Sequence, residues 1–455
     1  MNITKTIITI SLISSFNLLF AQKRPFIHAT DIKINIKENG KKTNNNWELM
    51  PYLHPDIYET KATTTPKRVT FYTNLDSISF DVVKNKIYDF DIILNNKDTC
   101  WTRISTFERF YFDPEFIKKN DKKYSIEVPE VQELVHIIMA ITKVGLEDYN
   151  LVNHYSDYYK KVIEKFQKFD NEPIVEIIND AMSKGAYSNI KMDACYLDFN
   201  QDKIVSKKNY KNLSWGNQNS LKNTISLLED FAKKTNFRAF YQENKALYEE
   251  EIKLLDKQTP IKKQWKWLEK RFDSKYNNYW ITFSPLVYGF HSTTWFVQDD
   301  FKQSVMFIQG PNKNNQQTKK IREANVTRMV FTEIDHNYVN PVSDIFIEEI
   351  NKSLNNIELW ANEDARKYYQ NEYAIFNEYM TWSVFMIYLK ENFNSKDYKE
   401  VQNDQSNFMV NTRGFIKFKE FNAKVIELYE NSKTKKIATL YPEILNWCKK
   451  NNINI

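Results

Sequence analysis

Two residues with the types and spacing of a zinc-peptidase helix, Glu333 and His336, lie in the run VFTEIDH at positions 330–336. Such helices read His-Glu-x-x-His: the two imidazoles bind zinc, and the glutamate acts as general base on the metal-bound water. Residues four apart on a helix share one face, about 6 Å apart along the axis, so both imidazoles can reach one metal. In this chain Thr332 occupies the position of the first imidazole.

Thr332 argues against a bound metal, because proteins bind zinc through thiolate, imidazole and carboxylate groups rather than through a neutral hydroxyl. Asp335 cannot supply the missing ligand, since it lies about 100° around the helix from His336. The Glu-x-x-His spacing alone is weak evidence, because Glu133 and His136 repeat it earlier in the chain. For that earlier pair we expect a position on a helix surface, beside a core face.

His291, in the sequence YGFHSTT at 288–294, precedes the motif and is a candidate for a substitute ligand. With His336 and a carboxylate from a later helix, it would form the two-imidazole, one-carboxylate set of hydrolytic zinc sites. A loop histidine beside aromatic residues is more commonly a surface or packing residue. Tyr338 and Asn340 could line the same cleft, although helix capping or packing is the commoner role of such residues.

Hydrophobic periodicity predicts the elements that would position these residues. Two strand-like segments, 279–283 and 303–308, precede the motif, and a helix is predicted over roughly 321–338, with Pro341 beyond its end. A second long helix is predicted at about 364–390. Strands that lead into a Glu-x-x-His helix, with a later helix adding a ligand, follow the order typical of zincins.

The residues from about 125 up to the strand predicted at 279–283 are predicted to be mainly helical. Apolar residues recur at helical spacing from Val131 and stop at Gly145. The same pattern continues at 158–169 and 173–182. The segment 221–257, rich in Glu, Lys and Leu, predicts one long helix or a broken pair.

The first part of the chain is predicted to be rich in β-strands. The segments 68–73, 77–82 and 88–94 alternate polar and apolar residues, or carry β-branched and aromatic residues between polar turns. The fold class expected for the whole chain is therefore α+β. A small β domain at 22–110 is followed by a mostly helical domain with a short sheet at 125–455.

Residues 1–21 have the features of a secretory signal peptide. Lys5 supplies a positive charge before an apolar run, and Ala21 precedes the expected cleavage site. The apolar run is short and interrupted by polar residues, which disfavours a membrane-spanning helix. We therefore expect export to the periplasm or the cell exterior, with no transmembrane segment after cleavage.

The composition of the chain disfavours several functional classes. Its 455 residues, 42% hydrophobic and 15% aromatic, are typical of a packed protein with two or three domains. The 64 basic and 58 acidic residues are too evenly mixed to predict a nucleic-acid partner. No glycine-rich phosphate loop or Gly-x-Ser-x-Gly elbow is present. The chain has three cysteines, Cys100, Cys195 and Cys448, and their spacing does not indicate which of them pair. The sequence does not indicate the oligomeric state either.

Three segments, 128–142, 284–286 and 333–341, resemble a family of secreted bacterial proteins catalogued as a domain of unknown function with a zincin-like core. Members of that family combine a signal peptide, a helix-rich body and a His-Glu-x-x-His motif that continues into an Asn-Pro helix end. The resemblance covers roughly residues 125–395 and leaves the β domain outside it.

The resemblance implies a third metal ligand: a glutamate on the helix after the motif, as in gluzincin peptidases. Glu378 is the matching residue, and Glu372, one and a half turns earlier, is the fallback. The chain departs from the family pattern at Thr332, where the first ligand is missing. That departure affects both zinc binding and hydrolysis.

Three functions follow as hypotheses. The first is a metallopeptidase-like pseudoenzyme that keeps Glu333, His336 and Glu378 and binds a peptide or protein, with no zinc expected. The second is an active zinc metallopeptidase in which His291 or another residue replaces the missing ligand. The third is a surface protein that binds a glycan or a protein through aromatic residues of the β domain, namely Trp47, Tyr52, Tyr72, Trp101 and Tyr111.

Overall fold

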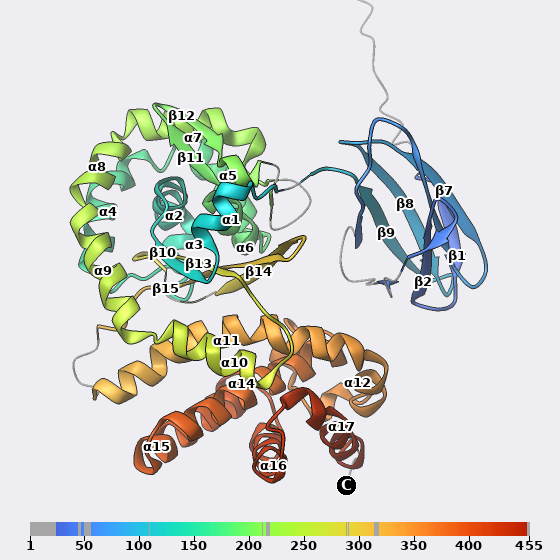
Figure 1. Cartoon of the computed structure of the whole chain (residues 1–455). Coiled ribbons are helices and arrows are strands. Elements are labelled where there is room, and N and C mark those ends of the chain that lie inside the picture. Colours follow the sequence, from blue (N-terminus) through green and yellow to red (C-terminus); the bar gives the residue numbers. More distant parts are fainter. Residues whose placement is uncertain are drawn as a thin grey trace, which may run out of the picture. The chain divides into compact units, whose positions relative to one another are not determined.

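The computed structural model describes residues 24–43, 47–49, 56–108, 110–211, 213–214, 219–287, 289, 291–313 and 318–452. The chain divides into two compact units, unit 1 up to Glu108 and unit 2 from Arg109 onward. Unit 1 is built of strands, and unit 2 is mostly helical with a short sheet, so the expected α+β class is confirmed (Figure 1). The expected signal peptide lies outside the described residues.

Unit 1 contains two sheets whose buried faces form one core. One sheet has the order β1-β8-β9-β5, with bounds Phe26–Ala29, Ile87–Leu94, Asp98–Ser105 and Asp56–Glu59. The other has the order β3-β2-β6-β7, with bounds Lys41–Lys42, Lys33–Glu38, Lys67–Tyr72 and Ser77–Val82, and β4 (Trp47–Glu48) also pairs with β2.

The core of unit 1 forms because alternate residues of each strand point to one face. Phe71 of β6 and Phe90 of β8 come from different sheets, and their ring centroids lie 4.9 Å apart. The strands predicted at 68–73, 77–82 and 88–94 are confirmed as β6, β7 and β8.

Unit 2 contains a four-stranded sheet of order β10-β13-β15-β14. Its strands are Lys123–Glu127, Asn278–Ser284, Phe301–Gln309 and Ser292–Gln298, in that spatial order. The first three are parallel, whereas β14 runs antiparallel to β15 and forms an edge. The predicted strands β13 and β15 are confirmed. Strand β14 was not predicted, although its run STTWFVQ is rich in β-branched and aromatic residues.

Ten helices of unit 2 precede β13 in the described part of the chain. They are α1 (Pro114–Asn120), α2 (Glu130–Ile141), α3 (Lys143–Glu147), α4 (Asp157–Phe166), α5 (Pro173–Ser183), α6 (Tyr187–Cys195), α7 (Ile225–Lys234), α8 (Phe237–Glu243), α9 (Lys245–Gln258) and α10 (Ile261–Arg271). A hairpin of β11 (Leu197–Asn200) and β12 (Lys203–Ser206) follows α6.

Two predictions for this region were wrong in detail. Gly145 does not end the first helix, because α2 ends at Ile141 and Gly145 lies inside α3. The hydroxyl of Thr142 accepts a hydrogen bond from the Gly145 amide at 2.9 Å and so caps α3. The segment 221–257 forms three helices: Asn236, in a left-handed conformation (φ 52°), separates α7 from α8, and Asn244 separates α8 from α9.

In its described residues, the C-terminal part of unit 2 consists of helices and the turns that join them, with one isolated bridge between Ala361 and Phe415 (Figure 1, yellow-orange to red). Its helices are α11 (Lys319–Ile345), α12 (Ile347–Ser353), α13 (Glu363–Arg366), α14 (Glu372–Asn392), α15 (Ser395–Asn407), α16 (Phe418–Asn431) and α17 (Tyr441–Lys450), and a π-helical turn spans Phe408–Thr412. The helix predicted at 364–390 is in fact α13 and α14. Asn371 separates them and caps α14 by accepting a 2.8 Å hydrogen bond from the Ala374 amide.

Helix α11 does not end before Pro341, as the sequence had predicted, but continues through it to Ile345. A proline inside a helix cannot donate a hydrogen bond to the carbonyl four residues earlier, which here belongs to Asn337. The hydroxyl of Tyr276 donates to that carbonyl instead, at 3.1 Å. A tertiary contact therefore satisfies the group that Pro341 leaves without a partner.

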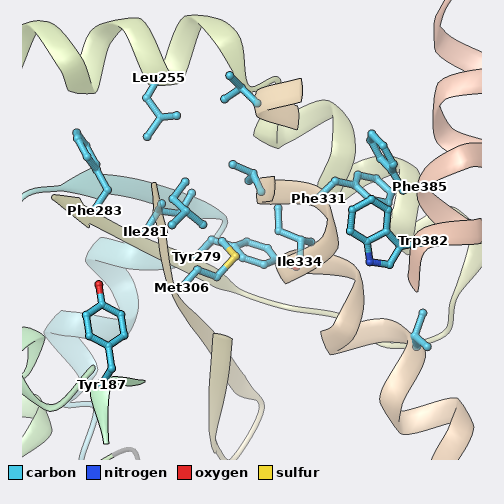
Figure 2. Packing of buried hydrophobic residues seen from close by; sticks show 14 of the residues in the cluster. Tyr187, Leu255, Tyr279, Ile281, Phe283, Met306, Phe331, Ile334, Trp382 and Phe385 are labelled. Carbon is cyan, nitrogen blue, oxygen red and sulfur yellow. The ribbon is translucent and has the colours of Figure 1, made fainter. Parts of the chain in front are cut away.

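Apolar residues fix α11 between the sheet and α14. Phe331 and Ile334 of α11, and Phe385 of α14, are fully buried, and the rings of Phe331 and Phe385 lie 5.7 Å apart. In Figure 2, Ile334 lies between Met306 of β15 on one side and Phe331 and Phe385 on the other. This packing sets the position of the opposite, polar face of α11.

Among the described residues, no helix is long and apolar enough to cross a membrane. The three cysteines are buried free thiols, so the structure pairs none of them.

Candidate functional site

The predicted motif lies on α11, and its second ligand position meets the predicted residue of α14. The distance between His336 Nε2 and Glu378 Oε1 is 3.6 Å. Two ligands of a tetrahedral zinc, each about 2.1 Å from the metal, lie roughly 3.4 Å apart. The structure thus brings together the two residues that the family resemblance paired. Glu372, the fallback, is the first residue of α14.

The other ring nitrogen of His336 faces polar side chains. His336 Nδ1 lies 3.3 Å from Asn340 Oδ1 and 3.4 Å from Thr381 Oγ1. Asn340 therefore contributes to the site, by orienting His336. Tyr338, in contrast, is fully buried, and its hydroxyl lies 2.7 Å from that of Tyr279, in agreement with a packing role.

The second oxygen of Glu378 is bound by a cation that the sequence did not reveal. Arg413 donates to Glu378 Oε2 at 2.8 Å, and the indole nitrogen of Trp382 lies 3.3 Å from the same oxygen. Arg413 also donates to the hydroxyl of Tyr369. Burial raises the pKa of Glu378, but Arg413 and His336 outweigh that effect and hold the pKa below its ordinary value. Glu378 is therefore a carboxylate with an arginine partner.

Thr332 is unsuited to replace the missing imidazole. Its hydroxyl donates to the carbonyl of Arg328, one turn earlier, at 2.9 Å. This is the local back-bond that threonine commonly forms inside a helix. Thr332 thus contributes neither a ligand of the usual type nor an unengaged hydroxyl proton.

His291 is buried near three cationic side chains, those of Lys191, Arg328 and Arg413. Its pKa is lowered to about 3, mainly by burial and also by the charges of Lys191, Arg328 and Arg413. Its Nε2 is buried and has no hydrogen-bond partner within the described residues. A neutral imidazole is the form that binds metal, but three neighbouring cations oppose a divalent ion there.

The donor set present does not fit zinc as it stands. His336 and Glu378 have suitable spacing, but Arg413 binds the carboxylate and Thr332 supplies no third ligand. Within the described parts of the chain, no three His, Cys, Asp or Glu residues form a group that could hold a metal ion.

Glu333, the candidate general base, retains the protonation behaviour that such a role needs. Burial raises its pKa to about 7, Glu378 raises it too, and His336, Lys191 and Arg413 lower it. No hydrogen bond to its carboxyl group is formed by the residues that the structure describes. Glu333 can therefore exchange a proton with a ligand near neutral pH.

Lys191 of α6 is the second residue that the sequence did not reveal. It is fully buried, and its ammonium lies 4.6 Å from the ring centroid of Phe307 and 5.1 Å from that of Tyr187. Burial lowers its pKa to about 7, whereas the charge of Glu333 raises it. A lysine in a short helix more than a hundred residues before the motif gives no sequence signal for this role.

The earlier Glu-x-x-His pair, Glu133 and His136, is not on a helix surface, so that prediction was wrong. Both residues are buried, at 0% and 2% exposure. The hydroxyl of Tyr158 donates to Glu133 at 2.8 Å, and His136 stacks on Phe307 with 5.1 Å between ring centroids. Burial raises the pKa of Glu133 to about 7 and lowers that of His136 to about 3.

Of the aromatic residues proposed for glycan binding, Trp101 and Tyr72 have cationic side chains over their rings, and Tyr111 is exposed. The guanidinium carbons of Arg24 and Arg103 lie 4.6 and 5.1 Å from the ring centroid of Trp101. The ammonium of Lys37 lies 4.6 Å from the ring of Tyr72. Of the remaining three residues, Trp47 packs on Phe71, Tyr52 lies outside the described residues and Tyr111 belongs to unit 2.

Comparisons with protein-family models, curated proteins and solved structures give no match to this chain.

Proposed function

We propose that unit 2 is a metallopeptidase-like protein that binds a peptide without hydrolysing it and without zinc. The ion pair between Arg413 and Glu378 is the observation that carries this proposal. In the arrangement that the resemblance implies, the carboxylate of Glu378 would bind the metal. Here the guanidinium of Arg413 neutralises that carboxylate. A divalent ion would have to displace the guanidinium from Glu378 and would then remain next to its positive charge.

The charges of the site support the same proposal. Arg413 balances Glu378, and Lys191 is coupled electrostatically to Glu333. Glu333 and Glu378 therefore each have a cationic side chain nearby. A site that had kept its metal would gain nothing from two such cations, because they would repel the ion.

Strand β14 supports a peptide as the ligand. It forms the edge of the sheet in the described part of unit 2, so one side of its backbone has no strand partner among the described residues, and a peptide strand could pair there. Asn337, the residue after His336, donates to Thr293 of β14 at 3.4 Å and to Ser304 of β15 at 3.0 Å. An extended peptide added to β14 would therefore lie close to the motif.

Metal analysis of the mature chain, purified without chelator, tests the first half of the proposal. We expect far less than one zinc per chain and no cleavage of a quenched random-peptide pool. Stoichiometric zinc together with peptide cleavage that a chelator abolishes would overturn it.

Peptide binding tests the second half. The exposed side chains of β14 are Trp295 and Val297, at 38% and 52% exposure. We expect immobilised random hexapeptides to retain the wild-type chain and to lose the Trp295→Ala, Val297→Ala variant. Val205→Ala, at an equally exposed position of β12, is the matched control. Equal retention of all three proteins would contradict binding at β14.

A second candidate is zinc-dependent hydrolysis with His291 as the substitute ligand. The 3.6 Å separation of His336 and Glu378 and the depressed pKa of His291 favour it. In that case zinc would be found in the wild-type chain and lost in His291→Ala. The metal analysis described above therefore separates the two candidates directly.

A further inference from the structure

Two guanidinium groups face one indole ring beside the motif. The Cζ atoms of Arg328 on α11 and of Arg413 lie 5.6 and 5.2 Å from the ring centroid of Trp382. Arg413 has Glu378 as its carboxylate partner. Arg328 donates to the neutral amide oxygen of Gln405 at 3.1 Å, and none of the described carboxylates lies within ion-pair distance of it. One of the two positive charges is therefore not balanced.

An unbalanced guanidinium in a partly buried site is unfavourable unless an anion joins it. The pKa of Arg328 is lowered to about 10, mainly by burial and also by the nearby charge of Arg413. Lys191 adds a third basic group to the same environment, and Glu333, Glu378 and Asp335 are its acidic groups.

The backbone that carries Arg413 is held in an irregular conformation. Arg413 follows the π-helical turn Phe408–Thr412, a form of helix that is frequent at functional sites. Gly414 has φ +76°, and a Cβ atom there would lie 2.0 Å from the Asn362 side chain. The backbone N–H of Asn362 donates a hydrogen bond to the Gly414 carbonyl at 2.9 Å. These contacts fix the backbone from which the Arg413 side chain extends.

The position of Arg328 places the unbalanced charge beside the motif. Arg328, Thr332 and His336 follow each other at four-residue spacing, so they share one face of α11. The side chains of Arg413 and His336 are each 21% exposed, which leaves the site open to solvent. The side chains of Arg413 and His336 are therefore partly accessible to a ligand.

We propose that Arg328 and Arg413 form a carboxylate-binding site that holds an acidic group of the bound peptide. This proposal rests on the peptide-binding function proposed above. Guanidinium groups bind planar carboxylates through paired N–H donors. A singly charged carboxylate fits better than a phosphate dianion, because the carboxylate of Glu378 is already bound to Arg413 and would repel the larger charge. The group is either the peptide's C-terminal carboxylate or an Asp or Glu side chain.

Three matched pools of random hexapeptides, tested for binding to the full chain, separate the sources of the carboxylate. One pool has free C-termini and no acidic residue, the second has amidated C-termini and no acidic residue, and the third has amidated C-termini and one fixed glutamate. Tighter binding of the first pool identifies the C-terminus, and tighter binding of the third identifies a side chain. Equal binding of all three would overturn the proposal.

The variant Arg328→Gln tests whether the preference comes from this site. Removing one charge-assisted hydrogen bond should weaken binding of the preferred pool about tenfold or more and leave the neutral pool unchanged. Arg322→Gln, which removes a guanidinium from the same helix, is the control and should keep the preference. Circular dichroism verifies that both variants are folded. A preference that survives in Arg328→Gln would overturn the proposal.

Benzoate separates failure of this proposal from failure of the proposed function. If no pool binds, the peptide-binding function fails, and calorimetric titration with benzoate then tests the carboxylate site alone. Binding of benzoate that is about tenfold weaker in Arg328→Gln supports the site. Absence of that difference overturns it. If peptides bind but benzoate and the acidic pools show no dependence on Arg328, the proposed function stands and this inference falls.

Discussion

The two Glu-x-x-His segments of this chain have the same spacing and opposite surroundings. Glu133 and His136 on α2 lie in the core, where a tyrosine and a phenylalanine contact them. Glu333 and His336 on α11 face arginine, lysine and a second glutamate. Burial is the main cause that raises the pKa of both glutamates to about 7. The same perturbed pKa therefore marks a structural residue in one place and a candidate site in the other. Glu251 and Lys191 act on the first pair too, but of the two histidines only His336 has a carboxylate of the described residues within 3.6 Å.

Loss of Arg413 should have the largest effect, because it leaves Glu378 buried without its partner. We expect Arg413→Ala to lower the free energy of unfolding by about 3–5 kcal/mol, measured by urea denaturation. The control is Arg366→Ala, whose partner Glu358 is 75% exposed, and it should cost about 1 kcal/mol or less. Similar losses in both variants would show that the Arg413–Glu378 ion pair contributes no more to stability than the exposed Arg366–Glu358 pair.

The pH dependence of stability should distinguish the two glutamates. The pKa of Glu133 is raised to about 7, so the folded state binds this proton more tightly than the unfolded chain, whose glutamate has a pKa near 4.5. The resulting stabilisation is complete below pH 4.5 and is lost as the pH rises through 7. Between pH 4.5 and 8, the stability difference should shift in favour of Glu133→Gln by about 3 kcal/mol.

For Glu333→Gln we expect a shift of the same sign and smaller size, because Glu333 is partly exposed and solvent screens its charge. Denaturant titrations of both variants and the wild type at the two pH values provide the measurement. A stability shift in Glu333→Gln equal to or larger than that in Glu133→Gln would contradict the expectation that solvent screens Glu333 more than Glu133.

Completing both motifs tests the difference in metal chemistry. Thr332→His and Gln132→His each create a full His-Glu-x-x-His sequence on a helix. Only the first has Glu378 within 3.6 Å of its second histidine, so only the first should gain zinc affinity, by roughly 100-fold over the wild type. Calorimetric zinc titration measures the gain. Equal behaviour of the two variants would argue against zincin ancestry of α11.

The smallest effect is expected for the hydrogen bond that stabilises the core pair. Tyr158→Phe removes the hydroxyl that donates to Glu133 and should cost about 1–2 kcal/mol of unfolding free energy. Tyr155→Phe, at a 72% exposed position, is the control and should cost almost nothing. Thermal unfolding at fixed pH compares them. No loss in Tyr158→Phe would show that Glu133 is satisfied without this donor.

The sequence predicted the elements of the fold better than the chemistry of the site. Strands β6, β7, β8, β13 and β15 follow their hydrophobic patterns, because burial of alternate or consecutive residues depends on local sequence. The family resemblance identified Glu378, which does lie against His336. Arg413 was not found, because it meets Glu378 through a π-helical turn 35 residues later in the chain and carries no motif.

The errors in the predicted helix ends have one physical cause. Gly145 and Pro341 are common helix terminators, and each lies inside a helix here. In both cases a contact from outside the regular backbone pattern satisfies the groups concerned: the Thr142 hydroxyl for α3 and the Tyr276 hydroxyl for α11. Such contacts depend on the folded arrangement and cannot be inferred from the local sequence.

The hydroxyl of Tyr276 has a consequence for how α11 can move. Tyr276 stands two residues before β13, so its bond to the Asn337 carbonyl ties the helix to the start of a central strand. A helix normally slides or rotates against its neighbours without changing its own hydrogen bonds. Here any axial shift would break a bond that Pro341 prevents the helix from replacing. The motif residue His336, directly before Asn337, is therefore held at a fixed height above the sheet, and a ligand must adapt to it.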